Sequence, residues 1–233
     1  MNKWLTPEQL TGRDETHLVE LAEGHRLYPA AAKAFAALQA DARAAGFELA
    51  IASSFRSFSR QMDIFNGKAS CQRTVHDDAG QAIDLSVLAP REQLAAILRF
   101  SALPGASRHH WGTDLDVYDR AAMPANYQLQ LTPEEVAPGG LFDPMHCWLD
   151  EKMAQGQSHG FFRPYAQDHG GVAIERWHLS YAPVAEALES ELDAELLTAC
   201  WGDELALSDV VNADLDAILA KYVKVPRGWC PST

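Results

Sequence analysis

Residues 107–119, SRHHWGTDLDVYD, contain side chains whose types and spacing could bind a metal ion. His109 and Asp116 are seven residues apart across a glycine. A loop that ends in His109 could fold back over a strand that presents Asp116, so this pair could occupy two corners of a metal site. His110 and Asp114 are alternative ligands, and spacing alone does not exclude them.

A second segment, IERWHLSY, places Glu175 and His178 three residues apart. Two His and one carboxylate around zinc leave a fourth position open for water, which is the arrangement of catalytic zinc sites. A neighbouring Glu can take the proton of that water. The segment therefore offers His178 as a third ligand and Glu175 as a general base. An iron oxygenase also uses two His and a carboxylate, but its H-x-D/E spacing is absent.

A third segment, SSFRSFSRQ, could bind substrate. Arg56 follows a predicted buried strand, and a guanidinium there suits bidentate capture of a carboxylate such as a peptide C-terminus. A surface salt bridge is the alternative role. Gln61 is five residues further on and could face the same cleft. Ser107 precedes the metal loop and could hydrogen-bond a substrate, although capping a loop is the commoner role of such a serine.

Helices and strands must position these residues. Pro29 opens an amphipathic pattern that predicts a helix over Ala30–Ala45, ended by a glycine. Short apolar or alternating runs predict strands over 47–54 and 113–118, the latter with Asp114, Asp116 and Tyr118 on one solvated face. The remaining expected elements are helices over 57–67, 90–100 and 141–156, a loop with a short helix over 120–140, and strands over 159–165 and 171–183 separated by a Gly170-Gly171 turn.

Strands interspersed with helices, without regular βαβ alternation, predict an α+β fold. No repeat or Gly/Ser linker divides the 233 residues, so we expect a single domain over 1–233. Its core would span about 29–183, followed by an acidic, Leu-rich helical tail over 184–233.

Composition excludes several classes of function. The net charge of -13 repels phosphate backbones and anionic lipid, so neither nucleic acid nor a membrane is an expected partner. The four cysteines form no CxxC pair, which disfavours a structural zinc knuckle or a disulfide framework. No secretory h-region or long apolar run is visible, so we expect a cytoplasmic location. Nothing in the sequence indicates the oligomeric state.

Taken in order, three motifs resemble those of the zinc D-alanyl-D-alanine carboxypeptidase and dipeptidase family. This family includes vancomycin-resistance peptidases, L,D-carboxypeptidases and phage muralytic endopeptidases. The motifs are S-x-x-R-S-x-x-x-Q at 53–61, S-x-H-x-x-G-x-x-x-D at 107–116, and E-x-W-H-x-x-Y at 175–181. The resemblance covers about 47–183.

The resemblance implies a fold and a set of roles. The fold would be a small α+β domain in which helices flank a central antiparallel sheet that carries the zinc. Glu175 would be the general base and then the acid, and Arg56 would polarise the scissile carbonyl or anchor substrate. The zinc ligands would be His109, Asp116 and His178, while Ser107 and Gln61 would contact the polar groups of the substrate.

The implied reaction is hydrolysis of a terminal D-Ala-containing bond in a dipeptide or muropeptide, with either D,D or L,D specificity. Three positions depart from the family pattern. Asp114 stands where the family usually has Ala, and its carboxylate could bind the metal, adjust local pKa values or point elsewhere. Arg176 replaces a usual Pro and Ser180 a usual Arg, which affects the expected substrate details. A non-catalytic zinc domain that binds peptides or partners is the alternative function.

Overall fold

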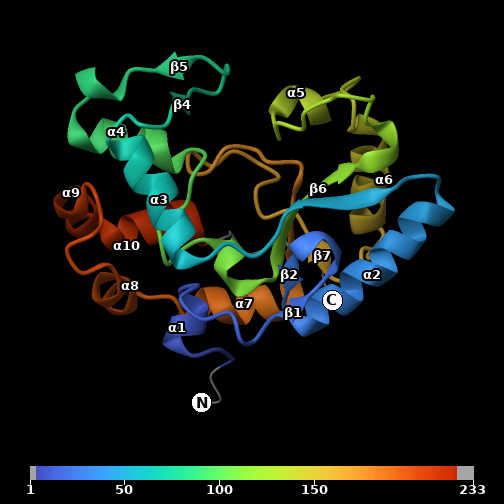
Figure 1. Ribbon diagram of the computed structural model, residues 1–233, viewed down its shortest axis with the longest axis horizontal. Coiled ribbons are helices and arrows are strands. Elements are labelled where there is room, and N and C mark those ends of the chain that lie inside the picture. The colour runs from blue at the N-terminus through green and yellow to red at the C-terminus, as the bar shows by residue number, and fades with distance from the viewer. Residues whose placement is uncertain (1–3, 225–233) are drawn as a thin grey trace.

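The computed structural model describes residues 4–224, and an antiparallel sheet of four strands lies at its centre (Figure 1). The strands run in the order β3 (Leu49–Ser53), β6 (Asp114–Asp119), β8 (His178–Tyr181) and β7 (Phe161–Phe162). In the register of β6 with β8, Asp116 pairs with His178 and Asp114 with Ser180. The register thereby brings two distant motifs side by side, and the expected α+β fold with a central antiparallel sheet is confirmed.

One face of the sheet is apolar. Side chains alternate between the two faces of a strand, so Leu115 and Val117 point away from Asp114 and Asp116. They are fully buried with Leu179 in one hydrophobic cluster. The helices α2 (Pro29–Ala44) and α6 (Asp143–Ala154) contribute to the same cluster, including Phe35 and Leu149. This cluster packs against one face of the sheet, so the polar side chains of β6 lie on the opposite face.

The polar face of β6 is buried, and the expectation of a solvated face is wrong. Asp114 is 0% exposed and Asp116 only 5%. A 3-10 turn, η3 (Arg108–Trp111), lies against this face, and Arg108 contacts Asp114 directly. The alternation correctly predicts a strand, but the covering turn cannot be inferred from it.

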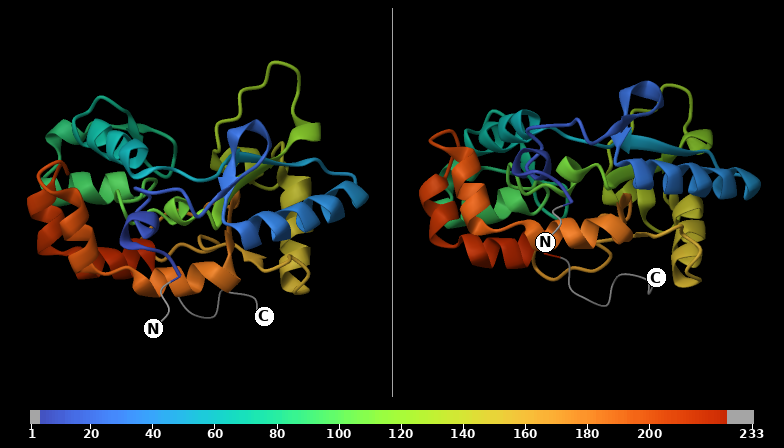
Figure 2. Two further views of the ribbon diagram at one scale, coloured as in Figure 1. Left: turned by 60° about the horizontal axis from the view of Figure 1, so that its bottom comes forward. Right: turned by 90° about the horizontal axis from the view of Figure 1, so that it is seen from below.

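A second hydrophobic cluster fills the other end of the molecule, where Figure 2 shows the C-terminal helices beside α3 (Phe58–Ala69) and α4 (Pro90–Leu98). Trp111 and Phe65 are among its buried members. The cluster continues through the segment after residue 183, where Leu188 and Leu197 are fully buried. The boundary predicted at residue 183, between the core and the C-terminal tail, therefore falls inside a hydrophobic cluster. Residues 225–233 of the expected tail lie outside the described residues. The helices around this cluster are α1 (Pro7–Leu10), α3 (Phe58–Ala69), α4 (Pro90–Leu98), α7 (Ala182–Glu191), α8 (Ala194–Trp201), α9 (Ser208–Ala213), α10 (Leu215–Ile218) and the π-helix η5 (Leu219–Val223).

Most predicted elements are present, but the strand expected over 171–183 is much shorter. Only β8 forms, and the Gly170-Gly171 turn does not close a hairpin. The backbone before β8 is bonded elsewhere, because Ala173 N–H donates to the Arg99 carbonyl and Glu175 N–H donates to the Tyr165 carbonyl. Glu175 consequently lies in a turn that leads into β8.

Short elements complete the described chain. Two hairpins pair β1 (Val19–Glu20) with β2 (Arg26–Leu27), and β4 (Val75–His76) with β5 (Ala82–Ile83). The rest are α5 (Pro133–Val136) and the 3-10 turns η1 (Ala22–Gly24), η2 (Leu85–Val87) and η4 (Arg120–Ala122). Among the described residues, no helix combines the length and apolar character needed to cross a membrane.

Candidate metal centre and catalytic site

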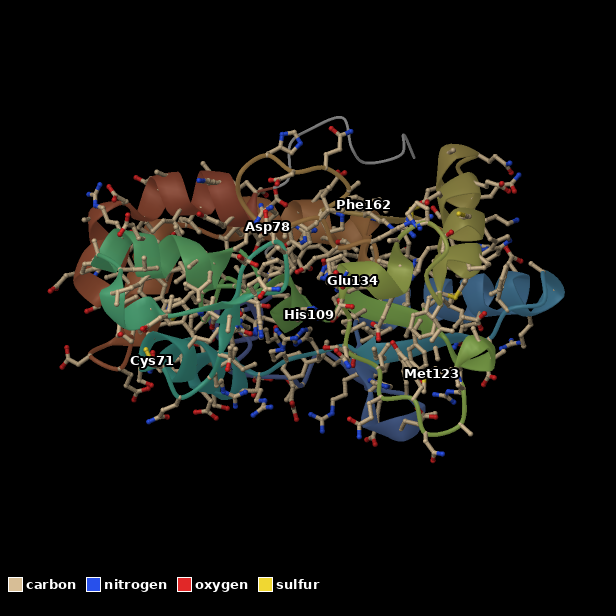
Figure 3. The ribbon with its side chains drawn as sticks, turned by 90° about the horizontal axis from the view of Figure 1, so that it is seen from above. Cys71, Asp78, His109, Met123, Glu134 and Phe162 are labelled. Atoms are coloured by element: carbon tan, nitrogen blue, oxygen red, sulfur yellow. The ribbon has the colours of Figure 1, made fainter. Side chains whose placement is uncertain are left out.

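His109, Asp116 and His178 form a buried cluster on the polar face of the sheet. One ligand atom from each lies within 4.8 Å of the other two. His109 Nε2 is 3.5 Å from Asp116 Oδ2, and His178 Nδ1 is 3.1 Å from Asp116 Oδ1. Figure 3 places His109 near the middle of the molecule, between Asp78 and Glu134 in that view. The structure thus brings together the three residues that were expected to bind metal.

A backbone contact orients His109. Its Nδ1 lies 2.9 Å from the Ser54 carbonyl oxygen, which can only accept a hydrogen bond. Nδ1 therefore carries the hydrogen, and the Nε2 lone pair faces Asp116. Burial lowers the pKa of His109 to about 4, so the ring is neutral at neutral pH and able to bind a metal ion.

His110, the alternative ligand, uses both ring nitrogens within the scaffold. Gly105 N–H donates to His110 Nε2 at 3.0 Å, and His110 Nδ1–H donates to the Arg56 carbonyl at 2.6 Å. The side chain is fully buried, and burial lowers its pKa to about 3. His110 therefore fixes the backbone of Arg56 and leaves His109 as the histidine that faces the cluster.

Glu175 borders the cluster from the turn before β8. Its Oε2 is 3.6 Å from His178 Nδ1, and its side chain is 15% exposed. Burial raises its pKa to about 7, and the charge of Asp116 acts in the same direction. A carboxyl group with that pKa can both accept and release a proton near neutral pH.

The chemistry of the cluster fits a divalent zinc ion. Two imidazole nitrogens and one carboxylate are a common donor set for catalytic zinc. Asp116 Oδ1 is buried, and its contact with His178 Nδ1 at 3.1 Å lacks hydrogen-bond geometry. Burial disfavours a charge on His178, yet its contacts with Asp114 and Asp116 raise its pKa to about 10. The charges of Asp114 and Asp116 therefore favour a cation at the cluster.

Arg56 and Gln61 lie together beside the cluster. Arg56 Nη1 donates to Gln61 Oε1 at 3.0 Å, and Gln61 Nε2 donates to the Ala102 carbonyl at 2.7 Å. Ser57 caps α3 through its side chain, as expected, and thereby starts the helix that carries Gln61. Burial lowers the pKa of the Arg56 guanidinium, while the charges of Asp116 and Glu175 oppose that change. Gln61 is fully buried and holds Arg56 in place.

Ser107 is buried at the start of η3, and its side chain does not cap that turn. Its carbonyl accepts a hydrogen bond from His110 N–H.

Lys68, which no motif indicates, donates from Nζ to Ser101 Oγ at 2.6 Å. Its pKa is lowered by burial and by the charge of Arg56. Lys68 thus adds a second cation to the surroundings of Glu175.

A pocket of about 680 Å³ is lined by Ile174 and Arg176, the sequence neighbours of Glu175, but its lining includes neither Glu175 nor the three residues of the cluster. The lining also includes Asp78, Arg99, Val136 and Asp143.

Comparison with known proteins gives matches of three kinds. The family model described as VanY, D-alanyl-D-alanine carboxypeptidase, matches residues 24–184. Two uncharacterized proteins of Haemophilus influenzae are similar in sequence. One is 50% identical over 103 residues, which cover 42% of this chain and 70% of that protein. The other is 34% identical over 125 residues, which cover 52% of this chain and 92% of that protein.

Two solved structures share the fold. VanYB in complex with D-alanine-D-alanine has a TM-score of 0.50 and 22% identity, covering 87% of this chain and 91% of that one. The LdcB LD-carboxypeptidase also has a TM-score of 0.50, with 23% identity and coverage of 81% and 80%.

Proposed function

The chain belongs to the D-alanyl-D-alanine carboxypeptidase family, and from that premise we propose that it is a zinc peptidase. It would hydrolyse a terminal D-Ala-containing bond in peptides derived from peptidoglycan. The observation that carries the proposal is the buried cluster of His109, Asp116 and His178 with Glu175 at its border.

His109 Nε2, His178 Nδ1 and one oxygen of Asp116 would hold the zinc ion. When bound, zinc supplies a Lewis acid that acidifies a water molecule and polarises the scissile carbonyl. The three side chains are buried, and Glu175 Oε2 lies 3.6 Å from His178 Nδ1 at the border of the cluster.

Glu175 would act as the base and then the acid. Its Oε2 would accept the proton of the attacking water and then deliver that proton to the nitrogen of the leaving D-Ala. The elevated pKa of about 7 suits both steps, because neither protonation state is strongly favoured near neutral pH.

Arg56 would bind the substrate carboxylate or polarise its carbonyl, with Gln61 holding the guanidinium at the correct angle. Ser107 and Gln61 would contribute polar contacts to the peptide. The pocket lined by Ile174 and Arg176 would accommodate the remainder of a longer muropeptide.

Product analysis tests the reaction and its specificity together. Purified, zinc-loaded protein is incubated with defined muropeptides that end in D-Ala or D-Ala-D-Ala, and the products are identified by mass spectrometry. Release of free D-Ala from one of these substrates, lost with chelator and restored by zinc, is expected. No cleavage of any D-amino-acid peptide, with binding retained, would instead favour a non-catalytic peptide-binding domain.

Replacement of Glu175 tests the mechanism. We expect Glu175→Gln to lower kcat by about 10²–10⁴-fold, the usual contribution of a general acid-base group. Zinc content measured by atomic emission should be unchanged, because Glu175 is not among the three proposed ligands. Undiminished turnover in this variant would refute the assigned role.

A further inference from the structure

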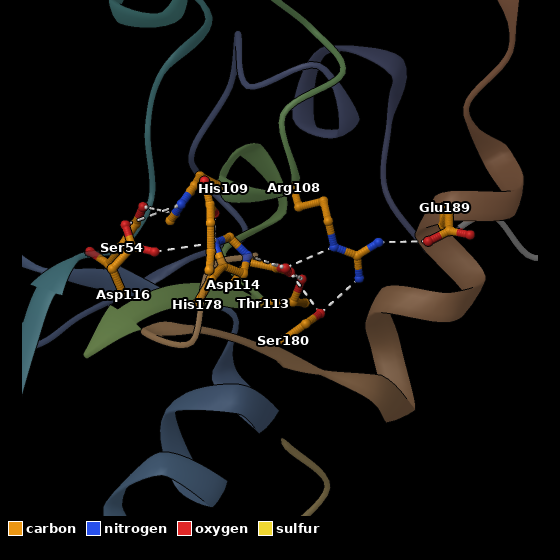
Figure 4. Close-up of polar contacts among 10 residues, drawn as sticks. Ser54, Arg108, His109, Thr113, Asp114, Asp116, His178, Ser180 and Glu189 are labelled. Atoms are coloured by element: carbon orange, nitrogen blue, oxygen red, sulfur yellow. Dashed lines mark hydrogen bonds and ion pairs between the residues drawn. The ribbon is translucent and has the colours of Figure 1, made fainter. Parts of the chain in front are cut away.

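Asp114 is the carboxylate that departs from the family pattern, and its role toward the metal rests on the proposed zinc site. Asp114 lies on the same face of β6 as Asp116 but contacts the opposite side of the His178 ring (Figure 4). His178 Nδ1 faces Asp116 Oδ1 at 3.1 Å, whereas His178 Nε2 faces Asp114 Oδ1 at 3.0 Å. The imidazole is therefore held between two carboxylates that have different partners.

Both oxygens of Asp114 are fully engaged. Oδ1 accepts from His178 Nε2 and from Arg108 Nε at 2.8 Å. Oδ2 accepts from Thr113 Oγ1 at 2.6 Å and from Ser180 Oγ at 3.0 Å. Four donors use the lone-pair directions of a carboxylate, and the residue is 0% exposed. Asp114 thus has no free lone pair for a metal ion, which removes it as an alternative ligand.

Arg108 binds the carboxylate of Asp114 and orients it. Its guanidinium is 2% exposed and donates to Asp114, to Ser180 Oγ at 2.8 Å and to Glu189 Oε2 at 2.6 Å. Glu189 lies on α7, so a chain of alternating charges runs from that helix through Arg108 to Asp114 and His178. A buried carboxylate with such a partner remains ionised and keeps its orientation.

An ionised carboxylate only accepts hydrogen bonds, so the hydrogen between Asp114 and His178 belongs to Nε2. In the neutral ring, the lone pair then belongs to Nδ1, the nitrogen that faces Asp116 and Glu175. We propose that Asp114, held by Arg108, is a positioning residue that fixes the orientation and tautomer of His178 for zinc binding. Carboxylates that support a metal-binding histidine in this way typically contribute a factor of about 10–100 to metal affinity.

Zinc affinity of the whole chain provides the test, measured by competition with a chromophoric chelator. We expect Asp114→Ala and Asp114→Asn each to raise the zinc Kd by about 10–100-fold. Asp119→Asn is the matched control, because Asp119 is a buried carboxylate on the same strand whose Oδ1 accepts from the Glu48 and Ala121 N–H groups. The control should leave the zinc Kd unchanged, and thermal unfolding of each variant reports whether it is folded.

A second readout needs no substitution. In ¹H–¹⁵N NMR spectra of the zinc-loaded protein, His178 should carry its hydrogen on Nε2, with Nδ1 bound to zinc. A hydrogen on Nδ1, or Asp114 variants with the zinc Kd of the unsubstituted protein, would overturn the inference and leave the zinc peptidase intact. Failure of the unsubstituted protein to bind zinc would overturn the proposed function, and this inference with it.

Discussion

At the scale of single residues, the surroundings of Glu175 are suited to an anionic substrate. Arg56 and Lys68 are both partly buried, and their charges lower the pKa of Glu175 against the effect of burial. Among the described residues, Lys68 Nζ donates a hydrogen bond to the hydroxyl of Ser101. An ammonium group has three donors, so Lys68 retains capacity for a substrate carboxylate.

We therefore expect Lys68→Met to weaken binding of peptides with a free C-terminal carboxylate. A hydrogen bond to a charged group contributes about 1.5–3 kcal/mol, and partial exposure places the effect at the lower end. The expected loss in kcat/KM is about tenfold, mostly through KM. The measurement compares each peptide with its C-terminal amide, because only the free acid should be affected.

Lys33→Met is the control for this prediction, since Lys33 is exposed on α2 below the sheet. It removes the same charge from the molecule without altering the site. Equal losses for acid and amide peptides in Lys68→Met would show that Lys68 does not bind the carboxylate.

Residue types and spacing predicted a cluster that the structure brings together, but spacing alone did not decide between His109 and His110, and only the family resemblance favoured His109. His109 and His110 are adjacent, so their separations from Asp116 in the sequence differ by only one residue. Their roles are separated by contacts with the Ser54 carbonyl and the Gly105 N–H, which depend on the tertiary fold. Asp114 was ambiguous for the same reason, because its partner Arg108 is identified only once the η3 turn covers the strand.

At the scale of elements, the η3 turn positions His109, and Gly112 ends this turn. Gly112 has φ +69°, and a Cβ there would lie 2.4 Å from Leu18 Cδ2 and 2.9 Å from the Tyr28 nitrogen. Its carbonyl also accepts a hydrogen bond from Tyr28 N–H. The glycine in the metal-binding motif thus allows the chain to return tightly from His109 to β6.

Gly112→Ala should destabilise the fold by about 1–3 kcal/mol, because a side chain is forced into a left-handed conformation and against backbone. Gly156→Ala is a matched control, with φ +66° and nothing within 4 Å of the added Cβ. Urea unfolding of both variants separates the steric effect from the conformational one. Similar midpoints would show that the turn relaxes freely around position 112.

Elements with strong local signals were predictable, and those defined by distant contacts were not. The Pro-initiated, apolar-periodic helix α2 and the Ser57-capped helix α3 match their predictions within about two residues. The segment 171–177 has the β-branched and aromatic residues of a strand, but only its last residue bonds to the sheet, where the Trp177 carbonyl accepts from Val117 N–H. The backbone before it bonds to Arg99 and Tyr165, and this irregular path places Glu175 beside the cluster.

At the scale of the whole molecule, the site lies between two hydrophobic clusters. Trp111, two residues after His109, belongs to the cluster around α3 and α7, while Leu115 and Leu179 belong to the cluster under the sheet. The polar residues at this boundary are consequently buried without being part of either apolar core. This arrangement holds several ionisable groups in protonation states that unfolding would change.

His146 shows that effect most clearly away from the metal centre. It lies on α6, is fully buried, and accepts a hydrogen bond from Arg163 Nη2 at Nδ1. Burial and the charge of Arg163 lower its pKa to about 2, from an ordinary value of 6.5. In the unfolded chain the ring takes up a proton as the pH falls below about 6.5, whereas in the folded chain it remains neutral.

Unfolding therefore takes up a proton at His146 in mildly acidic solution, and stability should decline as the pH falls from about 6.5. A difference of one bound proton changes the free energy of unfolding by about 1.4 kcal/mol per pH unit. Between pH 6 and 4.5, His146→Gln should flatten the slope of stability against pH by up to that amount. His76→Gln, which alters an exposed histidine, should leave the slope unchanged. Urea unfolding at constant zinc concentration measures both slopes, and identical slopes for the two variants would contradict a neutral buried His146.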